Sequence, residues 1–382
     1  MEPFSPFCPV DIRVLSADEG TFAAGKMLSA HAHRLLVFTS KSLLATLSVN
    51  SFIGKLQKDG HDVFTLTIAS NPSVTDLSAT IVRLREQAFS PTCVLAIGGG
   101  SCLDMAKAVS ALWYLPLSEA ADTNAIRHAI RTQAYRQSTS FIDWIAMPTT
   151  TGTGSEVTPW ATVWDTEQCS KLSIDSIQLF AKAAILIPDW MTSMPASLTL
   201  STGLDAVSHA MEAFWAKARS PLSQTLALRA VQIASVTLPQ VLQCPVDIEL
   251  RREMCMASLL AGLAFSLTRT TACHSISYPL TLLHHVPHGF AAAITLAEVL
   301  DRNRAAVPEI AQLENIFCEF GGLDSWLSGI CEKVQPLRLS AFHITEAHLP
   351  AIAKHTFTQG RMDNNPLAFS PQDVMNILFA CL

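Results

Sequence analysis

The chain has 382 residues, of which 49% are hydrophobic and 15% charged, and its formal net charge is −6. This length suffices for two domains with a large core, and the low charge content argues against long disordered stretches. A negative net charge argues against a nucleic-acid groove as the main function, and the uncharged apolar run 254–268 is too short to span a bilayer. We therefore expect neither a nucleic-acid nor a membrane partner.

The cysteines and the first residues indicate a compartment. Ten cysteines are dispersed without any C-x-x-C pair, and the opening M-E-P-F-S-P-F lacks the basic and apolar regions of a signal peptide. Dispersed thiols without a secretory signal are typical of a reducing environment. We expect a cytoplasmic protein.

The first half of the sequence alternates strand-like and helix-like segments. Helix-sized stretches lie at 74–87 and within the more polar residues 113–140. Short apolar runs that end at turn residues predict strands at 35–39, 63–69, 93–97 and 144–147, and further extended pieces follow at 161–165, 171–175 and 183–189. This alternation predicts a parallel sheet covered by helices.

Beyond about residue 190 the β-branched runs become rare and helical periodicity takes over. Pro188 and Pro195 interrupt the chain between the two halves. Helices are predicted at 198–217, 222–242, 248–267 and 291–299. We therefore predict an α/β domain over 1–188 and an all-helical domain over 189–382.

The second half contains a set of possible metal ligands. Asp205 and His209 stand four residues apart in helical sequence, so one helix face presents both side chains. The later segment C-H-S-I-S-Y-P-L-T-L-L-H-H-V-P-H-G carries His274 and His288. One Asp and three His form an oxygen and nitrogen ligand set suited to iron or zinc. The Asp205–His209 pair alone also fits an ordinary surface contact.

Two glycine-containing loops follow predicted strands. The sequence G-G-G-S at 98–101 leads into a helix, where glycines let the backbone approach a pyrophosphate and the helix amides receive its charge. Its spacing is not G-x-G-x-x-G, so a plain tight turn explains it equally well. The loop M-P-T-T-T-G-T-G-S-E-V-T at 147–158 supplies many hydroxyl donors for phosphate and ribose oxygens. A flexible surface turn would explain its glycines but not its threonines.

Taken in order, the motifs G-G-G-S-x-x-D-x-A-K, P-T-T-x-G-T-G-S-E-V-T, T-G-L-D-A-x-x-H-A-x-E and H…P-H-G resemble the iron-containing (group III) alcohol dehydrogenases. The four blocks cover nearly the whole chain. The resemblance implies a Rossmann-like N-terminal domain for NAD(P), a helical C-terminal domain for the metal and catalysis, and the fold shared with dehydroquinate synthase. It implies hydride transfer between the nicotinamide and a small aldehyde or alcohol. We also expect a homo-oligomer, in the simplest case a dimer.

The resemblance assigns roles to individual positions. The metal, Fe²⁺ first and Zn²⁺ as the alternative, would be held by Asp205, His209, His274 and His288. The cofactor would contact Asn71, Gly98, Gly99, Gly100, Ser101, Thr149, Thr150, Thr158 and Lys171.

Two departures from the family pattern concern the cofactor and the proton. Many relatives have an acidic residue after the first strand to hold the adenosine ribose, whereas this chain has Ser40 followed by Lys41. Without that carboxylate a 2′-phosphate is not repelled, so NADPH fits as well as NADH. Many relatives also have a further His where this chain has Tyr278. The proton for the product could come from water, a ribose hydroxyl or Tyr278, which equally fits a packing role.

The segments S-I-S-Y-P-L-T, which contains Tyr278, and R-M-D-N-N-P, which begins at Arg361, resemble the phosphonoacetaldehyde reductase branch. Such enzymes reduce phosphonoacetaldehyde to 2-hydroxyethylphosphonate, whose buried phosphonate needs a cation. We nominate Arg361, with Arg269 second. Leu367 stands where this branch would be expected to carry a basic residue. In the alternative, Arg361 makes a surface salt bridge and the pocket takes a neutral aldehyde.

Two other classes of function are compatible with parts of this sequence pattern. A lyase of the dehydroquinate-synthase type shares the architecture, NAD and a metal, but needs several Lys and Arg side chains for a sugar phosphate. The segments around Asp205 and His274 contain almost none, because Lys217, Arg219 and Arg269 are peripheral to them. An inactive binding protein is the third class, and the complete ligand set and both glycine loops argue against it.

Overall fold

The computed structural model describes residues 8–29, 32–116, 122–168 and 170–382. Two compact units make up the chain: unit 1 contains residues 8–149 and 155–191, and unit 2 contains 150–154 and 192–382. The stretch 150–154 therefore belongs to unit 2, although the chain on both sides of it belongs to unit 1. The sequence predicts a division at residue 188, and unit 1 continues a few residues further, to Met191.

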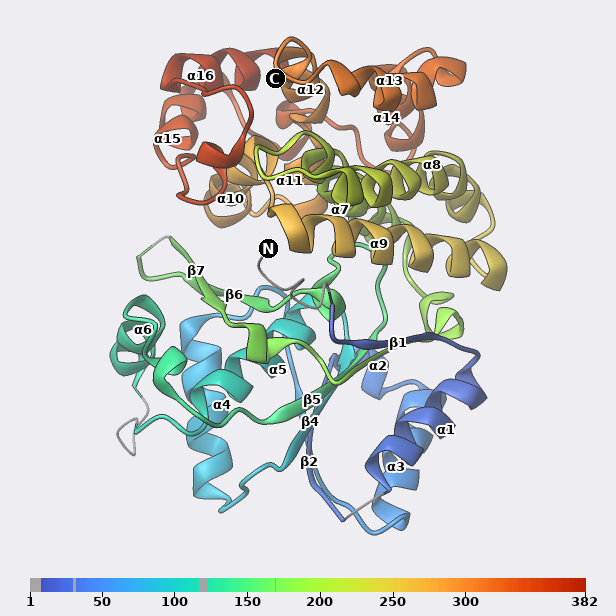
Figure 1. Cartoon of the computed structure of the whole chain (residues 1–382), viewed down its shortest axis with the longest axis vertical. Helices are drawn as coiled ribbons and strands as arrows, with labels where there is room; N and C mark the ends of the chain where they lie inside the picture. Colours follow the sequence, from blue (N-terminus) through green and yellow to red (C-terminus); the bar gives the residue numbers. More distant parts are fainter. Residues whose placement is uncertain (1–7, 30–31, 117–121, 169) are drawn as a thin grey trace, which may run out of the picture. The chain divides into compact units, whose positions relative to one another are not determined.

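Within the described residues of unit 1, six parallel strands form one sheet in the order β1-β8-β5-β4-β2-β3 (Figure 1). Strands β6 and β7 form a separate antiparallel pair. The strands are β1 Asp11–Val14, β2 Arg34–Thr39, β3 Asp62–Thr67, β4 Cys93–Gly98, β5 Asp143–Pro148, β6 Trp160–Asp165, β7 Ser170–Asp175 and β8 Ala183–Leu186. The predicted parallel sheet is thereby confirmed.

Burial follows the position of each strand in the sheet. Strands β4 and β8 lie inside it and are buried at every residue, whereas β1 at one edge alternates between exposed and half-buried residues. Apolar runs such as C-V-L-A-I suit a strand covered on both faces, because side chains on both faces then meet a helix layer. This pattern explains why the central strands were readily predicted from sequence.

Helices cover both faces of the sheet (Figure 1). Helices α1 and α3 pack against one face, whereas α5 packs against β4, β5 and β2 from the other. The helices of unit 1 are α1 Ala17–Leu28, α2 Lys41–Leu44, α3 Leu47–Lys58, α4 Val74–Glu86, α5 Gly100–Leu112 and α6 Thr123–Arg131. The predicted excursion at 113–140 contains α6, and residues 117–121 lie outside the described residues.

The strand order places a topological switch point between β2 and β4. After β2 the chain moves outward to β3 and then returns to pair β4 on the other side of β2. The helices that follow β2 and β4, α3 and α5, accordingly cover opposite faces of the sheet. In open parallel sheets, ligands bind in the crevice at such a point, beyond the carboxyl ends of the strands.

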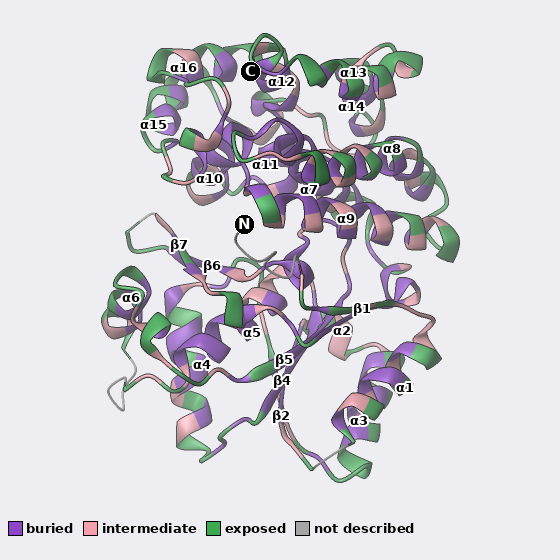
Figure 2. Ribbon diagram, viewed as in Figure 1, coloured by how far each residue is buried: buried purple, intermediate pink, exposed green. Residues whose placement is uncertain are grey.

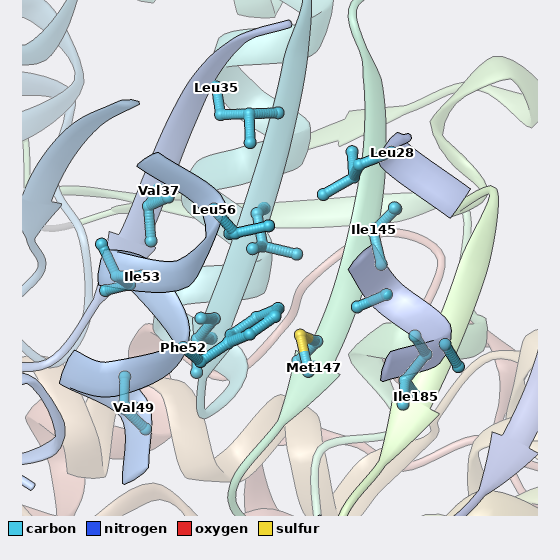
Figure 3. Close-up of a cluster of buried hydrophobic side chains, with 14 of the residues drawn as sticks. Leu28, Leu35, Val37, Val49, Phe52, Ile53, Leu56, Ile145, Met147 and Ile185 are labelled. Atoms are coloured by element: carbon cyan, nitrogen blue, oxygen red, sulfur yellow. The ribbon is translucent and has the colours of Figure 1, made fainter. Parts of the chain in front are cut away.

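A buried apolar cluster fixes α1 and α3 to the sheet (Figure 3). Residues two apart on a strand share a face, so alternate residues of the central strands point at these helices. Phe52 of α3 is 3% exposed, and its ring lies 6.3 Å from that of Trp190. The cluster also contains Leu28, Leu35, Val37, Val49, Ile53, Leu56, Ile145, Met147 and Ile185.

Unit 2 is helical throughout its described regular structure, apart from short 3-10 turns. Helices α7, α8 and α9 pack together, and α7 is buried along most of its length while α8 and α9 show exposed faces (Figure 2). The helices are α7 Ala196–Trp215, α8 Pro221–Gln243, α9 Ile248–Thr268, α10 Ala272–His284, α11 His288–Ala293, α12 Leu296–Asn303, α13 Ala311–Phe317, α14 Leu323–Cys331, α15 Leu349–Lys354 and α16 Pro371–Ala380.

Helix α8 is long and apolar enough to cross a membrane by length and composition alone. Half of its apolar window is buried inside the unit, as in the core helix of a globular protein, and α8 packs against α7, α9 and α13. Location in the cytoplasm stays a prediction.

One predicted helix of unit 2 is wrong. The sequence predicts a single helix over 291–299, whereas α11 ends at Ala293 and α12 begins at Leu296. Thr295, with a ψ of 3°, stands at the turn between the two helices. The apolar pattern continues through the turn because both helices bury the residues around it, so periodicity alone did not reveal the break.

Replacing Phe52 by alanine should destabilise unit 1 by about 3–5 kcal/mol, because the surrounding helices and strands cannot close the cavity. The measurement is the urea unfolding transition of the variant against wild type. Phe22→Ala is the matched control, since Phe22 of α1 is 69% exposed, and should change the stability by no more than about 0.5 kcal/mol. Equal stabilities of the two variants would contradict the buried position of Phe52.

Candidate metal and cofactor sites

Helix α7 presents three chemically active side chains on one face. Asp205, His209 and Glu212 follow each other at spacings of four and three residues, which places them in a row along the helix. All three are buried, with exposures of 3%, 6% and 0%. A buried row of two carboxylates and an imidazole needs compensating partners, because an unpaired charge in the interior is costly.

The partners come from the first turns of α10 and α11. His274 is the third residue of α10, and its Nε2 lies 3.4 Å from Oδ1 of Asp205. His288 is the first residue of α11, and its Nε2 lies 4.0 Å from the same oxygen. The ring of His274 stacks on that of His209 at 4.4 Å and meets that of His288 edge-on at 5.3 Å. The structure thus brings the four predicted ligands together around one carboxylate.

The charges within this cluster shift one another's pKa values. Burial opposes ionisation of Asp205, but the imidazoles of His209, His288 and His274 outweigh it and hold the pKa of the carboxyl well below its usual range. Burial lowers the pKa of His209 to about 4. For His274, burial is outweighed by Glu212 and Asp205, which raise the pKa to about 10. An arriving metal ion would displace this proton, because only the neutral imidazole is a ligand.

Glu212 holds the helix that carries His274. Its Oε1 accepts hydrogen bonds from the backbone N–H of Cys273 at 2.7 Å and of His274 at 3.3 Å, and from the hydroxyl of Thr271 at 2.7 Å. It therefore caps the start of α10 with a carboxylate, where the helix dipole favours negative charge. Its Oε2 contacts Nδ1 of His274. This contact leaves Nε2 of His274 facing Asp205.

Two glycines allow the close approach of other segments to α7. A Cβ at Gly289 would lie 1.8 Å from the carbonyl oxygen of Ser201, so only glycine lets α11 bring His288 this close. A Cβ at Gly152 would lie 2.3 Å from the carbonyl oxygen of Thr202. The carbonyl of Gly152 lies 3.2 Å from Nδ1 of His209, which can donate to it and leave Nε2 available as a ligand.

The cluster fits a divalent metal. Ligand atoms of Asp205, His209 and His274 all lie within 4.8 Å of one another. Oδ1 of Asp205 and Nε2 of His274 are buried and, beyond their 3.4 Å ion pair with each other, have no hydrogen-bond partner among the described residues, although buried polar atoms are almost always paired. A carboxylate oxygen and imidazole nitrogens suit Fe²⁺ or Zn²⁺.

The predicted cofactor residues of unit 1 follow four neighbouring strands at the carboxyl edge of the sheet. Ser40 follows β2, Asn71 comes after β3, Gly98–Ser101 end β4 and begin α5, and Thr149 follows β5. The backbone N–H of Asn71 donates to the hydroxyl of Ser101 at 3.1 Å, so two of these loops touch. The carbonyl of Gly98 accepts a hydrogen bond from the N–H of Thr149 at 3.1 Å, which joins the loop after β5 to the other two. The loops after β2 and β4 flank the switch point.

The other three residues predicted to contact the cofactor lie in different parts of the structure. Thr150 belongs to unit 2 and is half-buried. Thr158 is 1% exposed, and its hydroxyl lies 3.3 Å from Nζ of Lys107. Lys171 lies on β7, opposite Trp164 of β6. Their contacts with a cofactor stay predictions.

Tyr278 and Arg361 both lie in unit 2. Tyr278 is buried one helical turn after His274, and its ring is parallel to that of His288 at 6.3 Å. Arg361 is only 8% exposed, which excludes the predicted alternative of a surface salt bridge. Its segment is fastened to α10, because the N–H of Thr358 donates to the hydroxyl of Ser275 at 3.3 Å. Proton transfer by Tyr278 stays a prediction.

Two family models match this chain along most of its length. "Iron-containing alcohol dehydrogenase" matches residues 13–188, and "Fe-containing alcohol dehydrogenase family, C-terminal" matches residues 199–382. The chain belongs to the iron-containing alcohol dehydrogenase family. The resemblance inferred from the sequence motifs is confirmed.

Similar proteins agree with this assignment. "Probable alcohol dehydrogenase EutG" of Salmonella typhimurium is 30% identical over 81% of this chain and 77% of its own length. "Phosphonoacetaldehyde reductase" of Streptomyces viridochromogenes is 34% identical over 63% of this chain and 60% of its own length. The Escherichia coli EutG, 34% identical, is likewise covered over only 58% of its length. The crystal structure of sulfoacetaldehyde reductase from Bifidobacterium kashiwanohense in complex with NAD⁺ has a TM-score of 0.82 and 27% identity, covering 100% of this chain and 99% of that one.

The family assignment identifies the enzyme as an oxidoreductase that acts on alcohols, with NAD(P) and Fe²⁺ as its cofactors. It favours dehydrogenase chemistry over the lyase alternative. Sequence reasoning missed Glu212 as a functional residue, although the final E of T-G-L-D-A-x-x-H-A-x-E is this residue. Its spacing of seven residues from Asp205, two helical turns, was the signal that could have revealed it.

Replacing Glu212 by glutamine should weaken iron binding by about 10–100-fold, because the neutral amide no longer orients and polarises the imidazole of His274. Affinity is measured by competition with a chelator, and His274→Ala, which removes a ligand, should lose more. Glu253→Gln, at an exposed position of α9, is the control and should retain iron like the wild type. If Glu212→Gln retained iron as well as this control, the orienting role would be disproved.

Proposed function

We propose that this enzyme reduces a small aldehyde that carries an anionic group, with NAD(P)H as the hydride donor and Fe²⁺ held by Asp205, His209, His274 and His288. Phosphonoacetaldehyde is the substrate proposed for testing. The reverse reaction, oxidation of the corresponding alcohol, is part of the same chemistry. The proposal also includes a homodimer.

The observation that supports an anionic substrate is the burial of Arg361. Its guanidinium donates to the carbonyl of Gly360 at 2.8 Å and forms no ion pair with any other residue in the described part of the chain. A buried guanidinium without a carboxylate is costly, and an anionic ligand would relieve that cost. The attachment of its segment to Ser275, the residue after His274, connects Arg361 to the helix of the metal cluster.

The names of two similar proteins support the same class of substrate. One is a phosphonoacetaldehyde reductase and the other a sulfoacetaldehyde reductase. Phosphonate and sulfonate are both tetrahedral anions, which a guanidinium binds through two parallel N–H groups. An acetaldehyde with such a group is short, so the aldehyde carbon and the anion lie close together.

When bound, Fe²⁺ would supply Lewis-acid polarisation of the carbonyl, and NAD(P)H would supply the hydride. The four ligands hold the metal position, and Glu212 orients one of them from behind. Arg361 would bind the anionic end of the substrate and so orient the aldehyde. The burial of Asp205 and His274 excludes water from their side of the site.

The end of β2 supports the use of NADPH. Ser40 caps α2 by accepting a hydrogen bond from the N–H of Leu43 at 3.2 Å, and its hydroxyl lies 3.1 Å from that of Ser42. The next residue, Lys41, is exposed. Two hydroxyls and an ammonium group at this position would accept a 2′-phosphate, whereas the carboxylate of many relatives would repel it.

Replacing Arg361 by alanine should lower kcat/KM for phosphonoacetaldehyde by about 30-fold or more, equivalent to about 2 kcal/mol, because a buried charge pair is lost. Butanal, which is uncharged, should be reduced at nearly the wild-type rate. The measurement is NADPH oxidation followed by absorbance with both aldehydes.

Two further variants control this experiment. Arg361→Lys keeps the charge and should restore part of the preference for the anion. Arg229→Ala, at an exposed position of α8, should change neither substrate. Equal losses on both aldehydes would show a structural role for Arg361, and a wild-type enzyme without preference for the anionic aldehyde would overturn the proposed substrate class.

Replacing Ser40 by aspartate should shift the ratio of kcat/KM for NADPH over NADH toward NADH by about tenfold, or about 1.4 kcal/mol, because the new carboxylate repels the 2′-phosphate. Aspartate caps a helix as well as serine does, so α2 should stay intact. Ser51→Asp adds the same charge at an exposed position of α3 and should leave the ratio unchanged. An unaltered ratio in Ser40→Asp would show that position 40 does not lie next to the adenosine ribose of the bound cofactor.

A further inference from the structure

A fully buried lysine lies in unit 1 beneath the loops of the proposed cofactor site. Lys107 stands on α5, two turns after the glycine loop 98–101, and is 0% exposed. Its Nζ donates to the hydroxyl of Ser155 at 2.7 Å and to the carbonyl of Trp160 at 2.8 Å, and lies 3.3 Å from the hydroxyl of Thr158. One ammonium group therefore holds three points of the segment 155–160.

Asp104, one turn earlier on α5, holds the same segment. Its Oδ1 accepts from the hydroxyl of Ser155 at 2.7 Å, and its Oδ2 accepts from the N–H of Thr162 at 3.0 Å. Its Oδ1 also lies 3.9 Å from Nζ of Lys107. Ser155 thus accepts from the lysine and donates to the aspartate, so one hydroxyl joins both charges.

The charges of this network are compensated within it. Burial lowers the pKa of Lys107 to about 8, against the opposing effect of Asp104 and Glu156, so the amine remains largely protonated at neutral pH. Burial raises the pKa of Glu156, which is 3% exposed. A buried amine with no exposed atom cannot touch a cofactor or substrate directly. Its effect must pass through the segment that it holds.

The position of this segment matters because α5 carries both the glycine loop and the lysine. The N-terminus of α5 holds Ser101, whose hydroxyl also accepts from Asn71. The helix is a rigid spacer, so the contacts of Lys107 and Asp104 fix the threonine-rich loop relative to the glycine loop. Thr158 contributes to this support, since its hydroxyl is buried against the lysine.

We propose that Lys107 and Asp104 are positioning residues for NAD(P)H, which hold the segment 155–162 against α5 so that the two cofactor loops keep their relative position. The inference rests on the proposed cofactor site. It assigns a function to Asp104 and Lys107, the D and K of G-G-G-S-x-x-D-x-A-K. Lys107 itself is too deeply buried to contact a ligand. Misplacing one loop should reduce cofactor affinity while leaving the iron ligands, which belong to unit 2, intact.

The test is the affinity of the folded protein for NADPH, measured by nucleotide fluorescence with the iron-loaded and the iron-free enzyme. Lys107→Met removes the ammonium group but keeps a long apolar stem, and should weaken NADPH binding by about tenfold or more. Iron affinity should be unchanged. Lys55→Met, at an exposed position of α3, is the matched control and should bind NADPH like the wild type. Activity at saturating NADPH should fall much less than kcat/KM for NADPH.

A second variant covers the case in which Lys107→Met does not fold. Ser155→Ala removes one acceptor of the lysine and one donor to Asp104, and should weaken NADPH binding by a few fold, about 1 kcal/mol for one hydrogen bond. If the folded variants bind NADPH as the wild type does, with only a lower melting temperature, the residues are structural and the inference is wrong. If the wild type itself does not bind NADPH or NADH, the proposed cofactor site fails instead.

Discussion

The helical unit depends on the compensation of two buried carboxylates on one helix face. Asp205 and Glu212 of α7 are both almost fully inaccessible, and His274 lies between them, with one ring nitrogen toward each. Glu212 in addition caps the helix that carries His274, so the same carboxylate fixes both the position of α10 and the orientation of its imidazole. The ligand set is thereby built from backbone geometry and charge together.

In the α/β unit, hydrogen bonds and a buried charge fix the loops at one edge of the sheet. Its parallel sheet brings four strand ends to one edge, but loops at such an edge have no fixed position by themselves. Asn71, Ser101, Thr149 and the Lys107 network join these loops to one another. The loop around Gly152 continues into unit 2, where its carbonyl meets His209. The same loop therefore contains predicted cofactor residues and the carbonyl that contacts His209.

Much of this arrangement could be predicted because the signals are local. A run such as C-V-L-A-I predicts a buried strand, and β4 is buried at every residue. The spacing of Asp205 and His209 fixes their shared helix face before any tertiary contact forms. His274 and His288 were assigned through the family resemblance, since their distance along the chain contains no geometric information.

The sequence by itself determined the alternation of elements, the helix face of Asp205 and the order of the loops, since each follows from residue periodicity or a short motif. Only the tertiary structure decided that Glu212 caps α10 across about 60 residues, that Lys107 supports the segment 155–160, and that Arg361 is buried with no carboxylate partner among the described residues. The physical reason is that burial and pairing depend on which elements meet. A buried charge has the same letter in the sequence as an exposed one, and only the packed fold gives it a partner.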